Sequence, residues 1–333
     1  MDKLLSIVIP SYNAEKFLDN VLGELVKCHN LNRLDIMVIN DGSTDQTAEI
    51  GQKYQDSYPG SVRLISKENG GYGSTINTGI AQANGRYFKV VDADDWLDSK
   101  NLDRFVGLLK RTETDLILTP FWAFNDKNHH KHIPEIKPDD ISWGQKYYLK
   151  EQGICPVPSM HTYTLRTKLL QENEIQLDEH AYYVDIEYIL YPIPYVKTFE
   201  FVNIPLYNYR VNQDNQSISM TNMRKNQQQH SLVVDHVNSY IKEHADGLNP
   251  NQQELMVNRL SRMIATQLKI IDLAPIQMAT KHELSSFYRK VKDKYYFEPK
   301  DINLPMRWLI KSRFNLFPVI HYLAILKMQL VHY

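Results

Sequence analysis

The chain has 333 residues, of which 43% are hydrophobic and 23% charged, with 38 basic and 39 acidic side chains. This composition is that of a globular protein and excludes a disordered or collagen-like chain. Cys28 and Cys155 are too few for a disulfide framework or a four-cysteine zinc site, and they suit a reducing cytoplasm. A short apolar run at the N-terminus is interrupted by Pro10 and Asn13, so we expect neither a signal peptide nor a membrane span there.

The first 120 residues alternate strand and helix signals. Short β-branched runs predict strands at 5–9, 35–39, 62–65 and 87–91, the first ended by Pro10 with Asn13. Apolar spacing and capping residues predict helices at 14–27, 43–54 and 69–83. This order predicts an α/β fold with a mostly parallel sheet and helices on both faces. Ligands of such sheets bind at the carboxyl ends of the strands.

The rest of the chain divides at about residue 220. Residues 121–220 are rich in prolines and aromatics, and we expect them to form loops and short strands over one edge of the sheet. Residues 221–333 have a helical composition, for example at 232–241 and 255–273. We therefore predict one domain over 1–220, with halves 1–120 and 121–220, and a helical region over 221–333.

Three carboxylates, Asp92, Asp94 and Asp95, follow the fourth predicted strand. Anions this close repel one another unless a cation joins them, and hard oxygen ligands suit Mg²⁺ or Mn²⁺ with a diphosphate as co-ligand. The alternative is a solvated acidic loop in which Asp95 or Asp98 caps the next helix.

Two further motifs fall at the same edge of the predicted sheet. Asn40 to Asp45 follow the second strand and supply Asp41 and a glycine turn, although this is a good turn sequence in any protein. Pro10 to Asn13 follow the first strand and offer the ring of Tyr12 to a base. The sequence lacks GxGxxG after a strand and GxxxxGK[ST], which argues against a dinucleotide dehydrogenase and a P-loop kinase.

Together these segments resemble a known family. SIVIPSYNAEKFL, VINDGSTDQT, NGGYGSTINTGI and FKVVDADDW, in this order, look like the nucleotide-sugar-binding half of inverting glycosyltransferase family 2, which has the GT-A fold. The resemblance covers residues 4–120 strongly and extends more weakly to about 219. It implies a catalytic domain over 1–220, in which 1–120 binds the nucleotide sugar and 121–220 faces the acceptor.

The resemblance assigns roles to five residues at the strand ends. Pro10 and Tyr12 would pack against the nucleobase, and Asp41 would accept a hydrogen bond from a uracil-type ring nitrogen. Asp92 would hold the ribose. Asp94 would bind the Mn²⁺ or Mg²⁺ ion that bridges the diphosphate, with Asp95 as a reserve ligand.

The glycine-rich segment, with Asn69 and Gly70 on the donor side, departs from the family pattern. Ile76 stands where the family commonly has an arginine, so a cation that would face the phosphates is missing. Backbone N–H groups at the start of the helix can replace part of that role. Lys67 or Arg86 can contribute to it as well.

An inverting transfer needs a base that takes the proton from the acceptor hydroxyl. The resemblance implies an acidic pair at the start of a helix, and Asp185 matches its second acid while Val184 replaces the first. We predict that Asp185 is the base. The alternative is that Asp185 only stabilises the helix N-terminus and that Glu187 or Asp178 is the base.

Residues 207–219 are similar to the family's closing segment, in which Arg210 would face the diphosphate. The alternative, equally compatible with the sequence, is that Arg210 forms a structural ion pair. The QxxRW motif of processive synthases is absent, so we expect one sugar per encounter. His161 lies in a region that often lines the acceptor side, although a lone histidine is more often structural. The cluster His129, His130 and His132 could bind a soft metal, but its tight spacing in a polar loop favours solvated surface.

The formal charge is divided unevenly. Residues 221–333 hold 16 basic and 9 acidic side chains, against 22 and 30 in residues 1–220. Residues 304–330 mix aromatics with arginines and lysines, which fits an amphipathic surface resting on an anionic bilayer. It fits equally well helices packed on the catalytic domain or at a contact between subunits of a homo-oligomer, and we favour packing. No nucleic-acid module accompanies the charge.

The sequence therefore predicts a metal-assisted inverting glycosyltransferase of the cytoplasm, peripheral at the inner face of the membrane if the terminal surface binds lipid. It would move one sugar from a nucleotide sugar, most simply a UDP-sugar, to a hydroxyl of a glycan, a lipid-linked intermediate or a glycoprotein. Two alternatives are a nucleotidyltransferase that makes the sugar nucleotide and a catalytically silent scaffold that binds nucleotide. The first would need a basic, glycine-rich loop after the first strand, which residues 10–15 lack.

Overall fold

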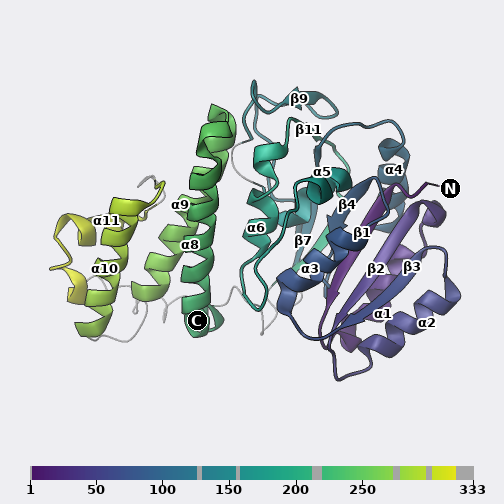
Figure 1. Cartoon of the computed structure of the whole chain (residues 1–333), viewed down its shortest axis with the longest axis horizontal. Helices are drawn as coiled ribbons and strands as arrows, with labels where there is room; N and C mark the ends of the chain where they lie inside the picture. The colour runs from purple at the N-terminus through teal and green to yellow at the C-terminus, as the bar shows by residue number, and fades with distance from the viewer. Residues whose placement is uncertain are drawn as a thin grey trace. The chain divides into compact units, whose positions relative to one another are not determined.

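The computed structural model describes residues 2–125, 130–154, 158–211, 220–272, 278–297 and 302–319. The chain divides into two compact units (Figure 1). The first unit is Met1–Gln213 with Asn249–Gln252, and the second is Asp214–Leu248 with Gln253–Tyr333. The first is an α/β unit, and the second consists of helices among its described residues. The division of roles between 1–220 and 221–333 stays a prediction.

An eight-stranded sheet forms the centre of the first unit, in the order β3-β2-β1-β4-β10-β6-β11-β9. Strands β1 to β4 pair in parallel, as predicted. Every residue of β1 and β2 is buried, which explains their continuous apolar runs, because both faces of a parallel sheet are covered. The strands are β1 (Leu5–Ser11), β2 (Leu34–Asp41), β3 (Val62–Lys67), β4 (Tyr87–Val90), β6 (Leu116–Leu118), β9 (Lys146–Tyr148), β10 (Tyr163–Arg166) and β11 (Thr198–Phe201).

Helices cover both faces of this sheet. Right-handed crossovers place α1 (Glu15–Leu25) and α2 (Thr47–Ser57) on one face and α3 (Gly71–Gln82) on the other. In agreement, α1 packs against α2, and α3 packs against β1 and β2. The remaining helices of the unit are α4 (Ser99–Leu109), α5 (Thr167–Glu172) and α6 (Asp185–Leu190), with short 3₁₀ turns at Leu31–Arg33, Met160–Thr162 and Ile193–Tyr195.

The middle of the chain extends the sheet, and the expectation that it lies over one edge is wrong. β10 inserts antiparallel between β4 and β6, and β11 and β9 continue beyond them. A second sheet, in the order β5-β12-β7-β8, is made of β5 (Trp96–Leu97), β7 (Phe121–Asn125), β8 (Lys131–His132) and β12 (Tyr207–Val211). Because β5 follows the acidic motif directly, its pairing with β12 brings residues 207–211 beside the carboxylates.

Pro10 does not end the first strand, because β1 continues to Ser11. Successive residues of β1 face β2 and β4 in turn. On the side of β4, the carbonyl of Leu4, just before β1, accepts from the N–H of Tyr87, and the carbonyl of Val8 accepts from the N–H of Val91, just after β4. Pro10 faces the same side, beyond the last ladder pair of Val8 with Val90. Its missing N–H therefore removes no hydrogen bond from the ladder.

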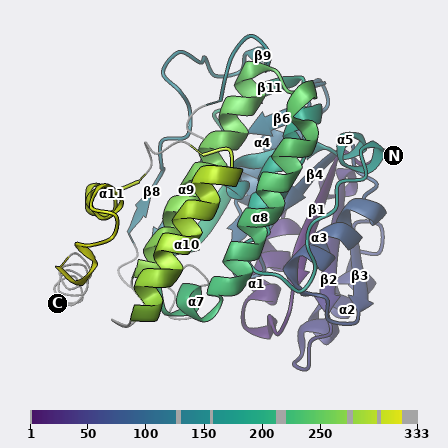
Figure 2. The same cartoon turned by 60° about the vertical axis from the view of Figure 1, so that its left-hand side comes forward.

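The second unit is built on three helices, α8 (Gln227–His244), α9 (Pro250–Asp272) and α10 (Met278–Lys294), with the short α7 (Met220–Lys225) and α11 (Leu304–Lys311) and a 3₁₀ turn at Ala245–Gly247. His230 Nδ1 on α8 lies 2.7 Å from Gln267 Oε1 on α9, and Lys290 on α10 pairs with Asp235 on α8 at 2.6 Å. These three helices lie side by side (Figure 2). Among the described residues, no helix is both long and apolar enough to cross a bilayer.

Candidate active site

The loops after β1 and β2 are joined by hydrogen bonds. Asn13 Oδ1 accepts from the backbone N–H of Thr44 at 2.9 Å, and Asn13 N–H donates to Ser43 Oγ at 3.0 Å. Tyr12, the residue before Asn13, is 57% exposed. Pro10 is buried within β1. Of the two residues predicted to face a nucleobase, Tyr12 therefore presents an open ring and Pro10 does not.

Asp41, the last residue of β2, anchors the start of α3. Its Oδ1 and Oδ2 accept from the N–H groups of Gly70 and Gly71 at 2.9 and 2.8 Å, and Lys67 Nζ donates to Oδ1 at 3.1 Å. The Asn69 side-chain amide donates to the Asp41 carbonyl at 2.9 Å. A carboxylate has about four acceptor positions, and the donors from Gly70, Gly71 and Lys67 take three of them on a side chain that is buried. The N–H groups of Gly70 and Gly71 are bonded to Asp41 in this structure, and a phosphate role for the backbone at the start of α3 stays a prediction.

Of the two predicted substitutes for the missing arginine, Lys67 and Arg86, the structure places Lys67 at the site and Arg86 away from it. Ile76 is buried in α3, so no cation could reach the site from there without disturbing the core. Arg86 precedes β4 and its N–H donates to the Lys3 carbonyl, which places it at the opposite end of the strand from Asp92. Lys67 lies at the site beside Asp41.

Two tyrosines hold the acidic motif. Tyr72 on α3 donates to Asp92 Oδ1 at 2.6 Å, and Tyr207 on β12 donates to Asp95 Oδ2 at 2.6 Å. The Tyr207 oxygen also accepts from the Asp92 N–H at 3.1 Å, and the Arg210 N–H donates to Asp95 Oδ1 at 2.7 Å. Asp95 is therefore a buried residue of the site and does not cap the next helix.

The cap of that helix is Asp98, whose side chain accepts from the Asn101 N–H at 2.8 Å at the start of α4. This part of the alternative interpretation is confirmed. It leaves Asp92, Asp94 and Asp95 outside the capping interaction.

Burial and mutual repulsion raise the pKa values of the carboxylates. Burial, with the charges of Asp94 and Asp185, raises the pKa of Asp92 to about 7, although the hydrogen bond from Tyr72 acts in the opposite direction. Burial, with the charges of Asp92 and Asp94, raises the pKa of Asp95 well above its ordinary value. A divalent cation would relieve this repulsion, so the chemistry of the cluster fits a metal ion.

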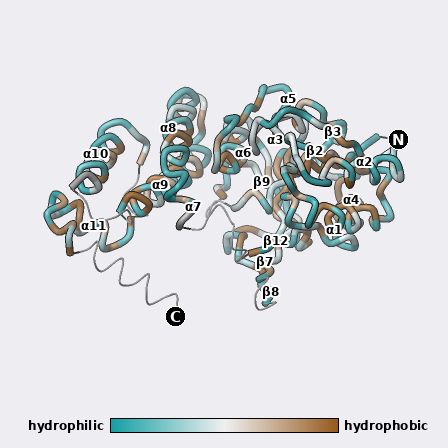
Figure 3. The backbone as a smooth tube through the Cα atoms, turned by 90° about the horizontal axis from the view of Figure 1, so that it is seen from below, coloured by the Kyte–Doolittle hydropathy of each residue, from teal (hydrophilic) through white to brown (hydrophobic). Residues whose placement is uncertain are grey.

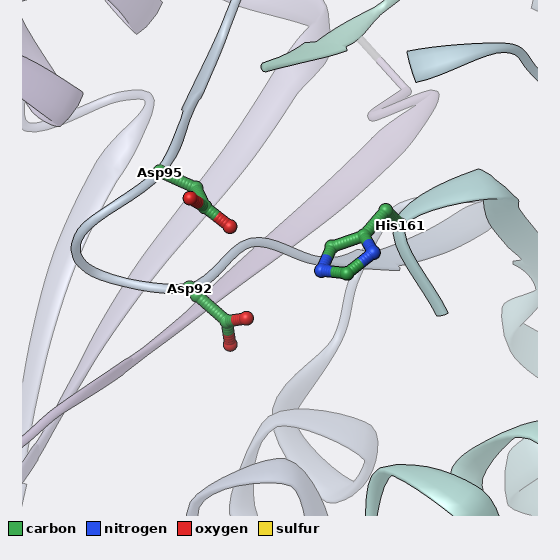
Figure 4. Close-up of side chains that lie close together, drawn as sticks. All are labelled: Asp92, Asp95 and His161. Atoms are coloured by element: carbon green, nitrogen blue, oxygen red, sulfur yellow. The ribbon is translucent and has the colours of Figure 1, made fainter. Parts of the chain in front are cut away.

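His161 completes a set of possible metal ligands that sequence reasoning did not assemble. One ligand atom each from Asp92, Asp95 and His161 lies within 4.8 Å of the others, with the three side chains gathered in one place (Figure 4). The His161 ring stacks on Tyr209, with centroids 4.1 Å apart, and contacts Tyr207 at 4.9 Å. Burial and the charge of Lys89 lower the pKa of His161 to about 3, so the imidazole is neutral, as a metal ligand must be.

Lys89 fixes the backbone that carries this histidine. Its side chain is fully buried in β4 and donates to the carbonyls of His161 at 2.8 Å and Tyr163 at 3.0 Å. Burial lowers the pKa of Lys89 to about 7. A single lysine within an apolar strand is the sequence signal that would have drawn attention to it.

Asp185 and Glu187 have different surroundings at the start of α6. Asp185 is half-buried and close enough to Asp92 to raise its pKa. Glu187 is fully buried, with Oε2 accepting from the Asp178 N–H at 2.7 Å and Oε1 from the Tyr191 hydroxyl at 3.1 Å. Glu187 therefore supports the loop before α6, and Asp185 is the acid that lies near the carboxylate cluster.

Arg210 lies in β12 next to the acidic motif. Its guanidinium lies over the rings of Trp96 and Phe17, 5.1 and 5.4 Å from the centroids, and Nε donates to the Asp94 carbonyl at 3.0 Å. The predicted closing segment after it, 212–219, and His129 lie outside the described residues.

Comparison with known proteins relates this chain to a known family. Residues 6–173 match the family described as Glycosyl transferase family 2. The teichoic acid poly(glycerol phosphate) polymerase of Staphylococcus epidermidis is 24% identical over 87% of this chain and 38% of its own length. The uncharacterized glycosyltransferase EpsJ of Bacillus subtilis is 33% identical over 42% of this chain and 40% of its own. The chain thus spans less than half the length of these relatives.

Solved structures share the fold. TarS 1-349 of S. aureus in complex with UDP matches with a TM-score of 0.53 and 20% identity, over 87% of this chain and 90% of that one. The mannosyltransferase PcManGT from Pyrobaculum calidifontis, in complex with GDP-Man and Mn²⁺, matches with a TM-score of 0.53 and 12% identity, over 98% and 88%. The predicted GT-A fold is confirmed. With half of its length matched by the family, the chain belongs to glycosyl transferase family 2.

Proposed function

We propose that this protein is an inverting glycosyltransferase that moves one sugar from a nucleoside diphosphate sugar to an acceptor hydroxyl. The observation that carries the proposal is the ligand set Asp92, Asp95 and His161 at the carboxyl end of β4, with Asp185 close by. UDP is the simplest nucleotide to propose, because two of the TarS structures are complexes, one with UDP and one with UDP-GlcNAc.

The donor would bind across the ends of β1, β2 and β4. Tyr12 would stack on the nucleobase, since its ring is exposed, and the remaining acceptor position of Asp41 would receive the base N–H. Asp92 would hold the ribose, as the family resemblance implies. Asn69 and Gly70 would act through Asp41, which they hold in place.

Mn²⁺ or Mg²⁺ would be held by the carboxylates and His161, with Asp94 as the ligand that the family resemblance implies. Carboxylate oxygens suit either ion, and the imidazole favours Mn²⁺ over Mg²⁺. Bound there, the ion would supply charge neutralisation to a diphosphate leaving group. Lys67 and Arg210 are the protein cations at the edge of the site that could add to this effect.

Asp185 would act as the general base. As the acceptor oxygen attacks the anomeric carbon, its proton passes to the Asp185 carboxylate, and the bond from that carbon to the diphosphate oxygen breaks on the opposite face. Attack from the opposite face inverts the anomeric configuration. A carboxylate positioned against the hydroxyl is a competent base at neutral pH.

The acceptor would be a hydroxyl on a glycan, a lipid-linked intermediate or a glycoprotein. Relatives named for teichoic acid synthesis support a cell-envelope glycan among these. We place the reaction in the cytoplasm, in keeping with the small number of cysteines and the buried thiol of Cys28.

The direct test is calorimetry with UDP in the presence and absence of Mn²⁺, followed by a screen of UDP- and GDP-sugars for donor hydrolysis. We expect nucleotide binding that is tighter with the metal, and hydrolysis of one or a few donors. Binding without any turnover across acceptors would favour the silent scaffold. Release of pyrophosphate from UTP and a sugar phosphate would identify a nucleotidyltransferase instead.

A further inference from the structure

Helix α11, the last helix among the described residues, and the turns after it pack one side against the rest of the second unit. Met306 and Leu309 are buried, as are Phe314 and Phe317 in the following turns. The Phe314 ring lies 6.1 Å from that of Tyr288 on α10. The apolar residues on this side therefore pack within the second unit, while packing on the catalytic domain or at a contact between subunits stays a prediction.

The other side of the same segment is apolar but exposed. Leu304 and Trp308 are 58% and 52% exposed, and Leu316 and Val319 are 44% and 58% exposed. Leu304 and Trp308 are four residues apart, so they share one face of α11. A helix whose outer face met only water would carry polar residues there. Along α11, hydrophobic and hydrophilic residues alternate (Figure 3).

Basic residues are interspersed with these apolar residues along the segment. Arg307, Lys311 and Arg313 are exposed, and residues 302–319 contain no aspartate or glutamate. The outward faces of α8 and α10 differ, because there acidic side chains such as Glu243 and Glu283 are interspersed with the basic ones. Exposed tryptophan and leucine beside arginine and lysine form the composition of a helix that lies in a membrane interface.

We infer that residues 304–319 form a docking surface for an anionic lipid bilayer. An anionic partner would match the three cations, and residues 320–333, which follow this segment, contain no aspartate or glutamate. A second copy of the same surface would set cations against cations. A nucleic acid would match the charge but leave the leucines and valine without a partner. The inference concerns a surface outside the proposed sugar-transfer site and does not depend on that activity.

The test uses the full chain and sedimentation with vesicles. We expect binding to vesicles of phosphatidylglycerol and phosphatidylcholine, weakened by salt, and little binding to phosphatidylcholine alone. Trp308→Ser should lower the affinity at least tenfold, and the double variant Arg307→Gln with Lys311→Gln by about fivefold per charge. Far-UV circular dichroism and the melting temperature check that each variant folds.

Matched controls lie elsewhere in the second unit. Leu232→Ser removes a leucine of α8 that is 45% exposed, and the double variant Arg289→Gln with Lys292→Gln removes two exposed charges from α10. Both should bind vesicles like the parent. Equal loss in test and control variants, or no binding to the anionic vesicles, overturns the inference. If the parent protein does not bind vesicles but forms a dimer or binds RNA, and Trp308→Ser abolishes that association, the surface belongs to that partner instead.

Discussion

The Tyr207 hydroxyl links two carboxylate residues of the site, donating to Asp95 at 2.6 Å while it accepts from the Asp92 N–H at 3.1 Å. Tyr207→Phe removes both contacts but keeps the ring that packs against His161. Because groups that orient metal ligands tune affinity, we expect Mn²⁺ to bind about 10- to 100-fold more weakly. Electron paramagnetic resonance of free Mn²⁺ measures this directly.

The control for Tyr207→Phe is Tyr54→Phe, which removes hydrogen bonds to Asp19 on the surface. It should leave Mn²⁺ binding unchanged. An unaltered Mn²⁺ affinity in Tyr207→Phe would show that Asp95 needs no orientation by this hydroxyl.

The second prediction separates two assignments of the metal ligands. If Asp92, Asp95 and His161 hold the ion, then His161→Gln should weaken Mn²⁺ binding by at least about tenfold. If Asp94 provides the binding without His161, the same variant should bind Mn²⁺ normally and only Asp94→Ala should lose it. His132→Gln, which changes an exposed histidine, is the control for both variants.

The sequence anticipated the parallel half of the fold because its signals are local. Buried apolar runs and helical spacing define β1 to β4 and α1 to α3, and right-handed crossovers then determine the faces. The insertion of β10 between β4 and β6 was missed. Those strands are three or four residues long, and their order depends on pairings between residues far apart in the chain, such as Leu165 with Phe88.

The same contrast holds at the site. Asp41 and Asp92 were found because each follows a strand that ends at the ligand-binding edge. Tyr207 and His161 were not assigned to the carboxylate cluster, because they come from segments more than 60 residues away that have no regular pattern. Their approach depends on the pairing of β12 with β5 and on the buried Lys89, neither of which local sequence reveals.

The third prediction concerns Gly73, where α3 lies against the loop that precedes α6. A Cβ there would overlap with the carbonyl oxygen of Asp178. Gly73→Ala should therefore destabilise the fold by about 1–3 kcal/mol and displace the loop that leads to Asp185. Gly107→Ala on α4 is the matched control, since nothing lies within 4 Å of its Cβ. It should stabilise slightly, because alanine favours helix, and urea denaturation of both variants measures the contrast.

The fourth prediction concerns pH and Glu187. Burial, with the nearby charge of Asp178, raises the pKa of Glu187 from 4.5 to about 8. Between these values the folded protein binds the proton that the unfolded chain has lost. The free energy of unfolding should therefore fall as pH rises through this window, by at most about 1.4 kcal/mol per pH unit.

Glu187→Gln should remove this part of the pH dependence, because the amide is neutral throughout. The control Glu172→Gln changes an exposed acid of α5 and should keep the parent's slope. Urea denaturation at several pH values gives the difference between variant and parent. A difference that does not change with pH would show that Glu187 is ionised in the folded protein.

The last prediction tests Asp185 as the base. Asp185→Asn keeps the size of the side chain and its place at the start of α6 but cannot take a proton. UDP and Mn²⁺ should bind with parental affinity, while transfer falls by about 10²- to 10⁴-fold, the usual contribution of a general base. Glu187→Gln should retain transfer, since its carboxylate is buried and bonded to Asp178 and Tyr191. The anomeric configuration of the product, read by NMR, must be opposite to that of the donor. A retained configuration, or near-normal transfer by Asp185→Asn, would assign the chemistry to another residue.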